Sequence, residues 1–199
     1  MALPQSTSRA APVLRPLRGV RILSLALNLP GPAALMRCRQ MGATCIKLEP
    51  PSGDPMGHFN KPAYAQLHEG VKVLSADLKA DAGQAVAHRE LARADVLLTS
   101  FRPSALDKLG LGWKKLHRLY PALSQIAIVG APGLRAEQPG HDLTYMADNG
   151  LINGLELPPT LYADMGGSLM ASEAALQAAL AKRATGRGVF IEVALSDAA

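Results

Sequence analysis

The sequence predicts an α/β fold in which helices cover both faces of a parallel sheet. Short apolar runs of strand length alternate along the chain with longer segments of helix-forming residues, an alternation typical of strand–helix–strand units. A chain of 199 residues with 48% hydrophobic residues can bury the core of one such domain. Glycine and proline stand between many of the runs and separate the predicted elements.

Three strands and one helix are predicted in the first 80 residues. Residues 20–27 are largely apolar and predict a buried first strand. Residues 33–41 contain helix formers and stop at a glycine, which predicts the first helix. Residues 43–48 predict a second strand, which ends before the turn-forming residues 50–53, and residues 72–78 predict a third.

The rest of the chain repeats this alternation. The last predicted helix is rich in alanine and leucine, which favour helix strongly, and it ends before a glycine. In chain order, the predicted elements are a helix over residues 81–93, a strand over 95–99, a short helix over 113–119, a strand over 123–129, a helix over 167–183 and a strand over 189–195.

Composition excludes several classes of protein. The chain is too apolar for a disordered protein, and it has no apolar run long enough to span a membrane. Two cysteines, Cys38 and Cys45, are too few for a disulfide scaffold and favour a reducing, cytoplasmic location. The net charge is +5, but aromatic residues make up only 4% of the chain. We therefore predict no nucleic-acid partner and no membrane partner.

The N-terminus favours a tail followed by a buried strand. Residues 1–16 contain Ser, Arg, Ala and Pro but no acid, and they predict a disordered extension. A mitochondrial presequence is the alternative interpretation of this tail. The apolar residues 22–29 superficially imitate a secretory signal, but Asn28 interrupts them and prolines follow, so a first strand explains them better.

Parallel sheets bind ligands at the carboxyl ends of their strands, so the loops that follow strands are the places to search. The turn after the first predicted strand is Leu-Pro-Gly-Pro-Ala over residues 29–33 and lacks the dinucleotide fingerprint. No Walker A sequence is present either. The sequence therefore supports neither NAD nor ATP as a ligand.

Several short motifs occur in a defined order across residues 17–197. They are residues 17–23 (LRGVRIL), 31–32 (GP), 41–54 (MGATCIKLEPPSGD), 76–79 (ADLK), 94–98 (ADVLL), 101–103 (FRP), 106–112 (LDKLGLG), 139–142 (PGHD), 163–167 (ADMGG) and 185–188 (TGRG). In this order the sequence resembles the family III CoA-transferases, which include formyl-CoA transferase, carnitine CoA-transferase and α-methylacyl-CoA racemase. The resemblance implies a Rossmann-like parallel sheet for residues 17–199 and acyl-CoA as the substrate.

The motifs around His141 and Asp164 look most like the racemase branch of that family. The resemblance implies that the two side chains are the acid and base that exchange a proton at the α-carbon of the thioester, which the carbonyl acidifies. In the transferases the aspartate that matches Asp164 is instead a nucleophile, which forms a mixed anhydride and then an aspartyl-CoA thioester. Without the family context, His141 is a cap or a core hydrogen-bonding group, and Asp164 caps the helix that follows it.

The resemblance also implies where coenzyme A would bind. Phe101, Arg102 and Lys108 follow the fourth predicted strand, and Leu29-Pro30 lie in the loop that covers the coenzyme in this family. Arg102 can pair with phosphate or polarise a carbonyl, and Lys108 supplies a point charge. The alternative for these residues is a surface charge pair beside a buried phenylalanine. No metal is implied.

Two departures from the family pattern bear on function. The family's Asn-Arg-Gly-Lys-Arg segment is replaced by residues 68–72 (HEGVK), which lack its central cationic residues. Family members are also about twice as long, so we expect this chain to match their N-terminal half, without the small domain. Three functions follow: an enzyme completed by a C-terminal-half polypeptide or by a homo-oligomer, a non-catalytic CoA-binding protein, or an α/β domain whose motifs serve packing alone.

Overall fold

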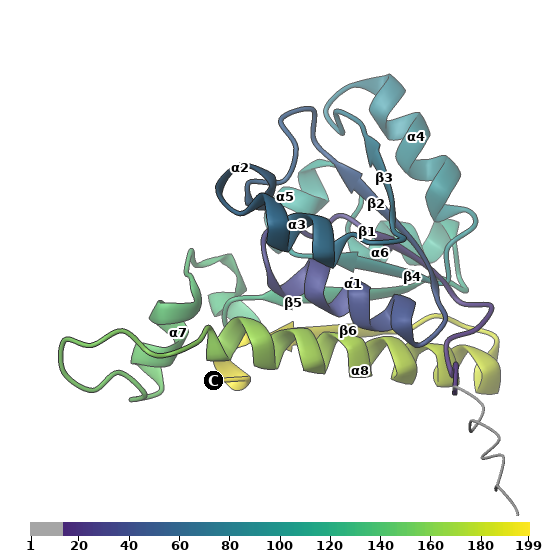
Figure 1. The fold of residues 1–199 in the computed structure, drawn as a ribbon. Helices are drawn as coiled ribbons and strands as arrows, with labels where there is room; N and C mark the ends of the chain where they lie inside the picture. Colours follow the sequence, from purple (N-terminus) through teal and green to yellow (C-terminus); the bar gives the residue numbers. More distant parts are fainter. Residues whose placement is uncertain (1–13) are drawn as a thin grey trace, which may run out of the picture.

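The computed structural model describes residues 14–199 and contains one six-stranded, fully parallel sheet (Figure 1). The strand order is β3-β2-β1-β4-β5-β6, so the chain runs outward to one edge and then returns to the centre. This confirms the predicted Rossmann-like α/β fold. The strands are β1 (Arg21–Ser24), β2 (Thr44–Glu49), β3 (Lys72–Ser75), β4 (Val96–Thr99), β5 (Ser124–Val129) and β6 (Phe190–Ala194).

Helices lie on both faces of the sheet, as the alternation predicts (Figure 1). Helices α1 (Pro30–Gln40) and α8 (Tyr162–Thr185) pack together on one face over a core that includes Ile22 and Ile126. Helices α4 (Asp81–Leu91) and α6 (Trp113–Leu119) contribute buried leucines to a second core on the other face. The central strands β4 and β5 are buried along their whole length, which explains their nearly continuous apolar sequence.

The predicted strands and helices all exist, but several bounds differ. Five of the six strands are shorter than predicted because their flanking residues turn away from the hydrogen-bonded ladder into the loops, while β2 keeps its predicted length but begins one residue later. Short helices in segments that lacked a clear helical pattern escaped prediction. They are α2 (Met56–Phe59), α3 (Lys61–Leu67), α5 (Pro103–Lys108), α7 (Asp142–Asp148) and the 3-10 helices η1 (Gly133–Glu137) and η2 (Leu195–Asp197).

The start of α8 is the difference that matters for function. The prediction began this helix at residue 167, but it begins at Tyr162 and therefore contains Asp164 in its first turn. Gly166 and Gly167 do not break the helix. A Cβ atom at Gly167 would overlap the Leu195 side chain, and one at Gly166 would crowd Ala198. The two glycines thus allow the C-terminal segment to lie close against α8.

Two further findings concern the ends of the chain and membranes. Residues 1–13 of the predicted extension lie outside the described residues. From Leu17 onward the chain is tied to the domain, because the Leu17 amide donates to the Met41 carbonyl at 3.0 Å.

Among residues 14–199, no helix combines the length and the apolar character that crossing a membrane requires.

Candidate active site

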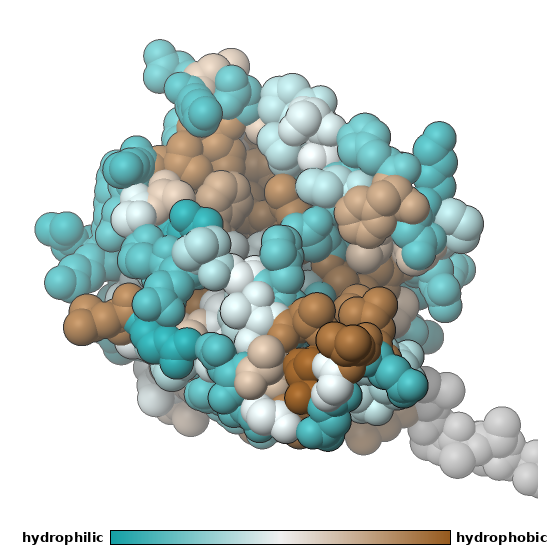
Figure 2. Space-filling view, turned by 90° about the vertical axis from the view of Figure 1, so that its left-hand side faces the viewer, coloured by the Kyte–Doolittle hydropathy of each residue, from teal (hydrophilic) through white to brown (hydrophobic). Residues whose placement is uncertain are grey.

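The candidate site lies at the carboxyl edge of the sheet, where the loop after β1, the turn after β4 and the start of α7 meet the first turn of α8 (Figure 1). This edge faces the viewer in Figure 2, where hydrophobic groups are set among hydrophilic side chains. In a parallel sheet this edge collects the loops that follow every strand. His141, Asp164 and Arg102 all belong to elements that begin at this edge.

Asp142 connects the two elements that carry the predicted catalytic pair. It is buried at the start of α7, directly after His141, and its carboxylate accepts a hydrogen bond from the Asp164 amide at 2.9 Å. The residue before α8, Leu161, provides no side-chain cap. Asp142 thus supplies the acceptor that the first turn of α8 lacks locally. Asp164 therefore lies inside the first turn of α8, where its amide is capped by Asp142. The alternative in which Asp164 is itself the N-cap residue of α8 is wrong.

The surroundings of Asp164 raise the pKa of its carboxyl group to about 6. Burial is the largest cause, because it disfavours the charged form, and the negative charge of Asp142 acts in the same direction. His141 lies near enough for its positive form to lower this pKa. A carboxyl group with a pKa near 6 can accept or donate a proton at neutral pH.

His141 begins α7 and remains exposed. Its amide donates to the Thr144 hydroxyl at 3.3 Å, and its carbonyl accepts from the Thr144 amide at 2.8 Å. The backbone of His141 is thus held by the first turn of α7. The capping alternative therefore holds for His141 at the start of α7, and its imidazole is also near enough to Asp164 to influence the pKa of that carboxyl group.

Tyr145 is a member of the site that the sequence analysis missed. It is buried, and the pKa of its hydroxyl is raised by burial first and then by the charge of Asp164, while Arg102 lowers it. A Cβ atom at Gly140 would come within 2.7 Å of the Tyr145 hydroxyl, and Gly130 is equally crowded by the ring. The two glycines therefore make room for this ring. The spacing of Tyr145 three residues after Asp142 was the only sequence signal for it.

The predicted coenzyme residues after β4 form one group. Arg102 precedes α5 and is exposed, Lys108 is exposed in its last turn, and Phe101 is half-buried against the core. Glu137 of η1 accepts two hydrogen bonds from Ser104, at 2.7 Å each. These bonds, with the nearby charges of Arg102 and Lys108, lower the pKa of Glu137. Within residues 14–199 neither cation forms an ion pair, so both present free charge at this edge.

Leu29 and Pro30, the other predicted coenzyme residues, lie where the loop after β1 enters α1. Asn28 just before them has a φ of +64°, and it is the only non-glycine residue with positive φ among residues 14–199. Its amide donates to the Asp54 carboxylate at 3.1 Å. The loop after β1 is therefore held by a hydrogen bond to Asp54, a residue of the loop that follows β2.

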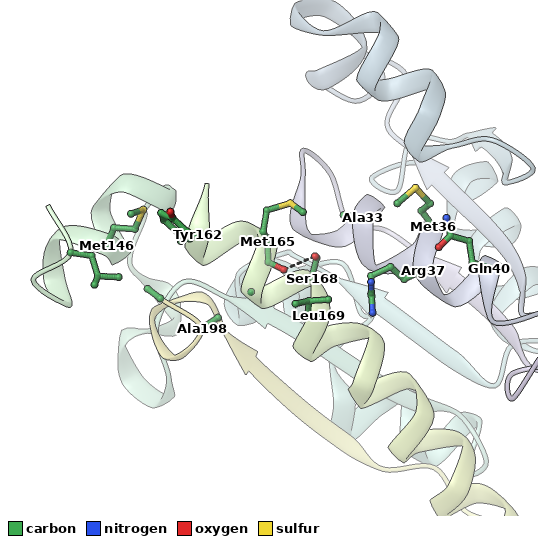
Figure 3. Close-up of a pocket in the computed structure, with 13 residues that line it drawn as sticks. Ala33, Met36, Arg37, Gln40, Met146, Tyr162, Met165, Ser168, Leu169 and Ala198 are labelled. Carbon is green, nitrogen blue, oxygen red and sulfur yellow. Dashed lines mark hydrogen bonds between the residues drawn. The ribbon is translucent and has the colours of Figure 1, made fainter. Parts of the chain in front are cut away.

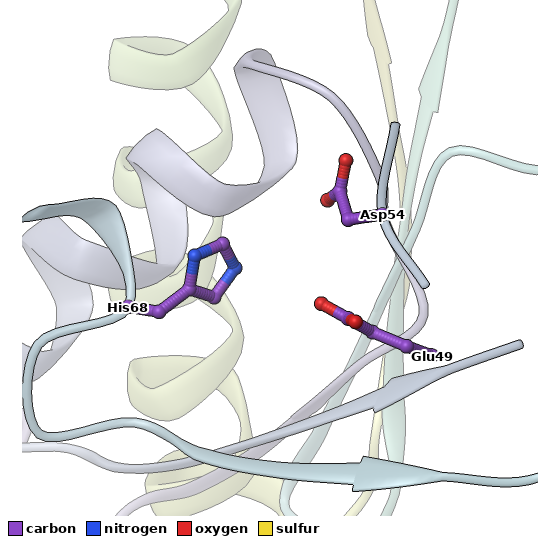
Figure 4. Close-up of side chains that lie close together, drawn as sticks. All are labelled: Glu49, Asp54 and His68. Carbon is purple, nitrogen blue, oxygen red and sulfur yellow. The ribbon is translucent and has the colours of Figure 1, made fainter. Parts of the chain in front are cut away.

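Asp54 belongs to a buried group of charged side chains in which Glu49 and His68 also converge (Figure 4). Such side chains are of the kind that bind metal ions. However, the ammonium group of Lys47 contacts all three of them. The Lys47 side chain therefore occupies the position that a metal ion would take among these three side chains.

An apolar groove of about 720 Å³ lies between α1 and α8 (Figure 3). Met36, Tyr162, Met165 and Leu169 line it, together with the last two residues of the chain. Asp164 and His141 do not line it. The groove is thus distinct from the cluster of polar side chains at the start of α7.

The chain is similar in sequence to a known family of proteins. The family model described as CoA-transferase family III matches residues 17–199. Succinyl-CoA–D-citramalate CoA-transferase of Chloroflexus aurantiacus is 34% identical over 200 residues, which are 92% of this chain and 50% of that protein. Mouse alpha-methylacyl-CoA racemase is 32% identical over 191 residues, or 91% of this chain and 48% of that protein.

Solved structures agree with this result. The crystal structure of Rv3272 from Mycobacterium tuberculosis superposes with a TM-score of 0.86 and 28% identity, and the match covers 94% of this chain and 55% of that chain. A CAIB/BAIF family protein from Brucella suis gives a TM-score of 0.84 at 28% identity, with 93% and 54% covered. The chain spans about half the length of the curated relatives it matches.

Proposed function

This chain belongs to CoA-transferase family III, and from that membership we propose that it transfers a proton at the α-carbon of an acyl-CoA thioester, in the manner of an α-methylacyl-CoA racemase. Asp164 and His141 are the proposed acid and base. Arg102, Lys108 and Phe101, with Leu29 and Pro30, are the proposed contacts of coenzyme A.

The observation that carries this proposal is the environment of Asp164. Its pKa of about 6 lets it hold a proton in part of the molecules and release it in the rest near neutral pH. His141 at the start of α7 is near enough to influence the pKa of Asp164, and it is the second group of the proposed pair. Inversion at a carbon requires one group to accept the α-proton and another to donate one to the opposite face.

The second candidate is acyl transfer with Asp164 as the nucleophile, and similarity to a succinyl-CoA–D-citramalate CoA-transferase supports it. In that reaction the Asp164 carboxylate attacks the thioester carbonyl and expels the CoA thiolate, which leaves a mixed anhydride. The thiolate then attacks the aspartyl carbonyl of the anhydride and expels the original acyl group as a free carboxylate, which leaves an aspartyl-CoA thioester. A third possibility, binding of coenzyme A without turnover, keeps Arg102 and Lys108 and leaves Asp164 unused.

Coenzyme binding is tested first, on the chain by itself. Calorimetric titration with coenzyme A and short acyl-CoAs should show saturable binding that weakens with salt, because phosphate contacts are charged. If neither ligand binds at low ionic strength, the assignment of the site to coenzyme A is wrong.

The chemistry is tested with a complementing polypeptide that corresponds to the second half of a family relative. In deuterated water, a 2-methylacyl-CoA should gain deuterium at its α-carbon, and His141→Ala should slow this exchange by about 10²–10⁴-fold. Hydroxylamine should find no acyl group on Asp164. Trapped acyl-aspartate without deuterium incorporation would instead establish the transferase reaction.

A further inference from the structure

The Lys47 ammonium group lies in the interior with every donor engaged. The side chain is 0% exposed, and the ammonium contacts Asp54, Glu49 at 3.0 Å and the His68 Nε2 atom at 2.8 Å. The Tyr64 ring lies beside it, 5.5 Å from the ammonium to the ring centroid. Burying a cation is costly unless such partners compensate it, so this arrangement is sensitive to any change in its partners.

Asp54 links this buried cation to the loop that follows β1. One carboxylate accepts hydrogen bonds from the Asn28 amide at 3.1 Å and from the Met56 amide at 3.0 Å, while it also contacts Lys47. Asn28 holds a left-handed backbone conformation that side chains other than glycine rarely adopt. The bond to Asp54 therefore helps to hold the loop in this conformation.

His68 fits this centre only in its neutral form. Its Nδ1 atom lies 2.7 Å from the Tyr64 carbonyl, which can only accept, so Nδ1 carries the proton. Nε2 then offers its lone pair to the Lys47 ammonium. A second proton on the ring would stand at Nε2 and face that ammonium directly.

We propose that Lys47, Asp54 and His68 form a positioning device that fixes the loop at residues 27–30 and releases it when His68 takes up a proton. The proposal rests on the proposed function in one respect, because Leu29 and Pro30 of this loop are the assigned coenzyme contacts. None of the three side chains needs to touch the ligand. They act through the Asn28 amide and the entry into α1.

The charges around His68 decide how easily it takes up that proton. Lys47 faces it from β2 and opposes protonation, while Glu49 at the end of β2 and Asp54 after it favour protonation. The Tyr64 ring of α3 stacks on the His68 ring, with centroids 4.1 Å apart, and the Tyr64 backbone carbonyl accepts a hydrogen bond from Nδ1–H. Burial is the largest influence, and the pKa of His68 lies below its ordinary value. The loop should therefore be held at neutral pH and released in acid.

The first test needs no ligand. In the wild-type chain, the NMR shift of the Asn28 amide should change with the same midpoint as the His68 ring nitrogens as the pH falls from about 8 to about 4.5, a range that brackets the ordinary histidine pKa. In His68→Gln, which keeps an acceptor for Lys47 but cannot titrate, this change should disappear. His58→Gln on the neighbouring helix α2 is the matched control and should titrate like the wild type.

Two results would overturn the device. One is an Asn28 amide that titrates in His68→Gln as it does in the wild type. The other, which needs no variant, is a wild-type Asn28 amide whose midpoint differs from that of the His68 ring. Either result would mean that His68 does not control the loop.

The second test measures coenzyme A affinity over the same pH range. The apparent Kd should rise about tenfold for each pH unit below the His68 pKa, because only the fraction with neutral His68 is competent to bind. His68→Gln should lose this dependence, while titration of the coenzyme's own phosphate is common to both proteins. An equal pH dependence in both proteins would contradict the link to coenzyme binding. If the wild type binds no coenzyme A at any pH, the proposed function fails, while the Asn28 measurement still decides the device.

Discussion

Asp164 is the residue whose chemistry depends most strongly on its neighbours. Its folded-state pKa of about 6 lies above the ordinary aspartate value of 3.8, so between these pH values the folded protein binds a proton that the unfolded chain has released. Ionised Asp164 therefore costs stability as the pH rises from about 4 to about 6, and the full cost is present at neutral pH. A residue that is unfavourable for stability and is nevertheless present fits a functional role better than a packing role.

The stability cost predicts the behaviour of Asp164→Asn. Because asparagine cannot ionise, the variant should be more stable than the wild type at pH 7, by up to about 3 kcal/mol for a shift of this size. The advantage should vanish below about pH 4, where Asp164 is protonated in both states. Urea unfolding at both pH values measures the difference. An Asp164→Asn chain that is less stable at pH 7 would show that the carboxylate is stabilised where it lies.

Arg102 is the residue for which the lack of a charged partner within the described part of the chain suggests ligand binding. It is exposed at the carboxyl edge without an ion-pair partner among residues 14–199. Arg102→Ala should weaken coenzyme A binding by about 1.5–3 kcal/mol, the range of a charge-assisted hydrogen bond. Calorimetric titration measures this loss. Arg135→Ala is the control, because that arginine pairs with Asp148 and is also exposed; equal losses in the two variants would point to a general charge effect.

At the level of elements, helices α7 and α8 are held together by side chains of the candidate site. Asp142 at the start of α7 caps the first turn of α8, and the ring of Tyr145 from α7 packs against two glycines. The geometry of the proposed catalytic pair is therefore a property of the junction between α7 and α8.

Gly140→Ala should disturb the junction. The new methyl group would come within 2.7 Å of the Tyr145 ring, which is closely packed, so the ring must shift. We expect a loss of about 1–3 kcal/mol of stability, as for other overpacked positions. The hydroxyl of Tyr145 should also change its titration, which ultraviolet difference spectra follow. Gly57→Ala is the control, since its new methyl group would meet Tyr64 only at ordinary contact distance; equal effects would contradict the packing argument.

For the whole molecule, the outer side of α8 is the most conspicuous surface. Leu169 is 49% exposed and Leu180 is 62% exposed, and Met165 and Met170 are also exposed on this helix. The apolar groove between α1 and α8 continues this surface (Figure 3). Large exposed apolar surfaces favour association. Because relatives are about twice as long, we predict that the chain self-associates or binds a complementing polypeptide through this face.

This prediction is measured by light scattering on the wild type and on a Leu169→Lys, Leu180→Lys double variant. The wild type should form oligomers, and the double variant should be monomeric at the same concentration, because lysine replaces apolar contact area with charge. Leu155→Lys is the control, since that leucine is fully exposed but lies in the loop before α8 and not on the helix. A wild type that stays a monodisperse monomer would contradict the prediction.

Much of the fold could be predicted from local patterns along the chain. Alternating apolar and helical segments are local patterns, and a parallel sheet with helices on both faces is the usual way to bury them. The short helix over residues 113–119 was predicted to the residue, because its apolar positions and flanking glycine are local features. The motifs around His141 and Asp164 likewise predict both side chains as the candidate catalytic pair, from their resemblance to the family pattern alone.

The environment of these side chains could not be predicted in this way, because it is made by residues distant in the sequence. Asp142 reaches Asp164 across 22 positions of sequence, and Lys47 meets His68 across 21, so no local pattern signals either contact. Helices such as α2 and α5 are too short to be stable by their own propensity and are held by packing, which sequence periodicity does not record. The pKa of Asp164 and the neutral state of His68 both follow from burial, and burial exists only once distant segments have come together.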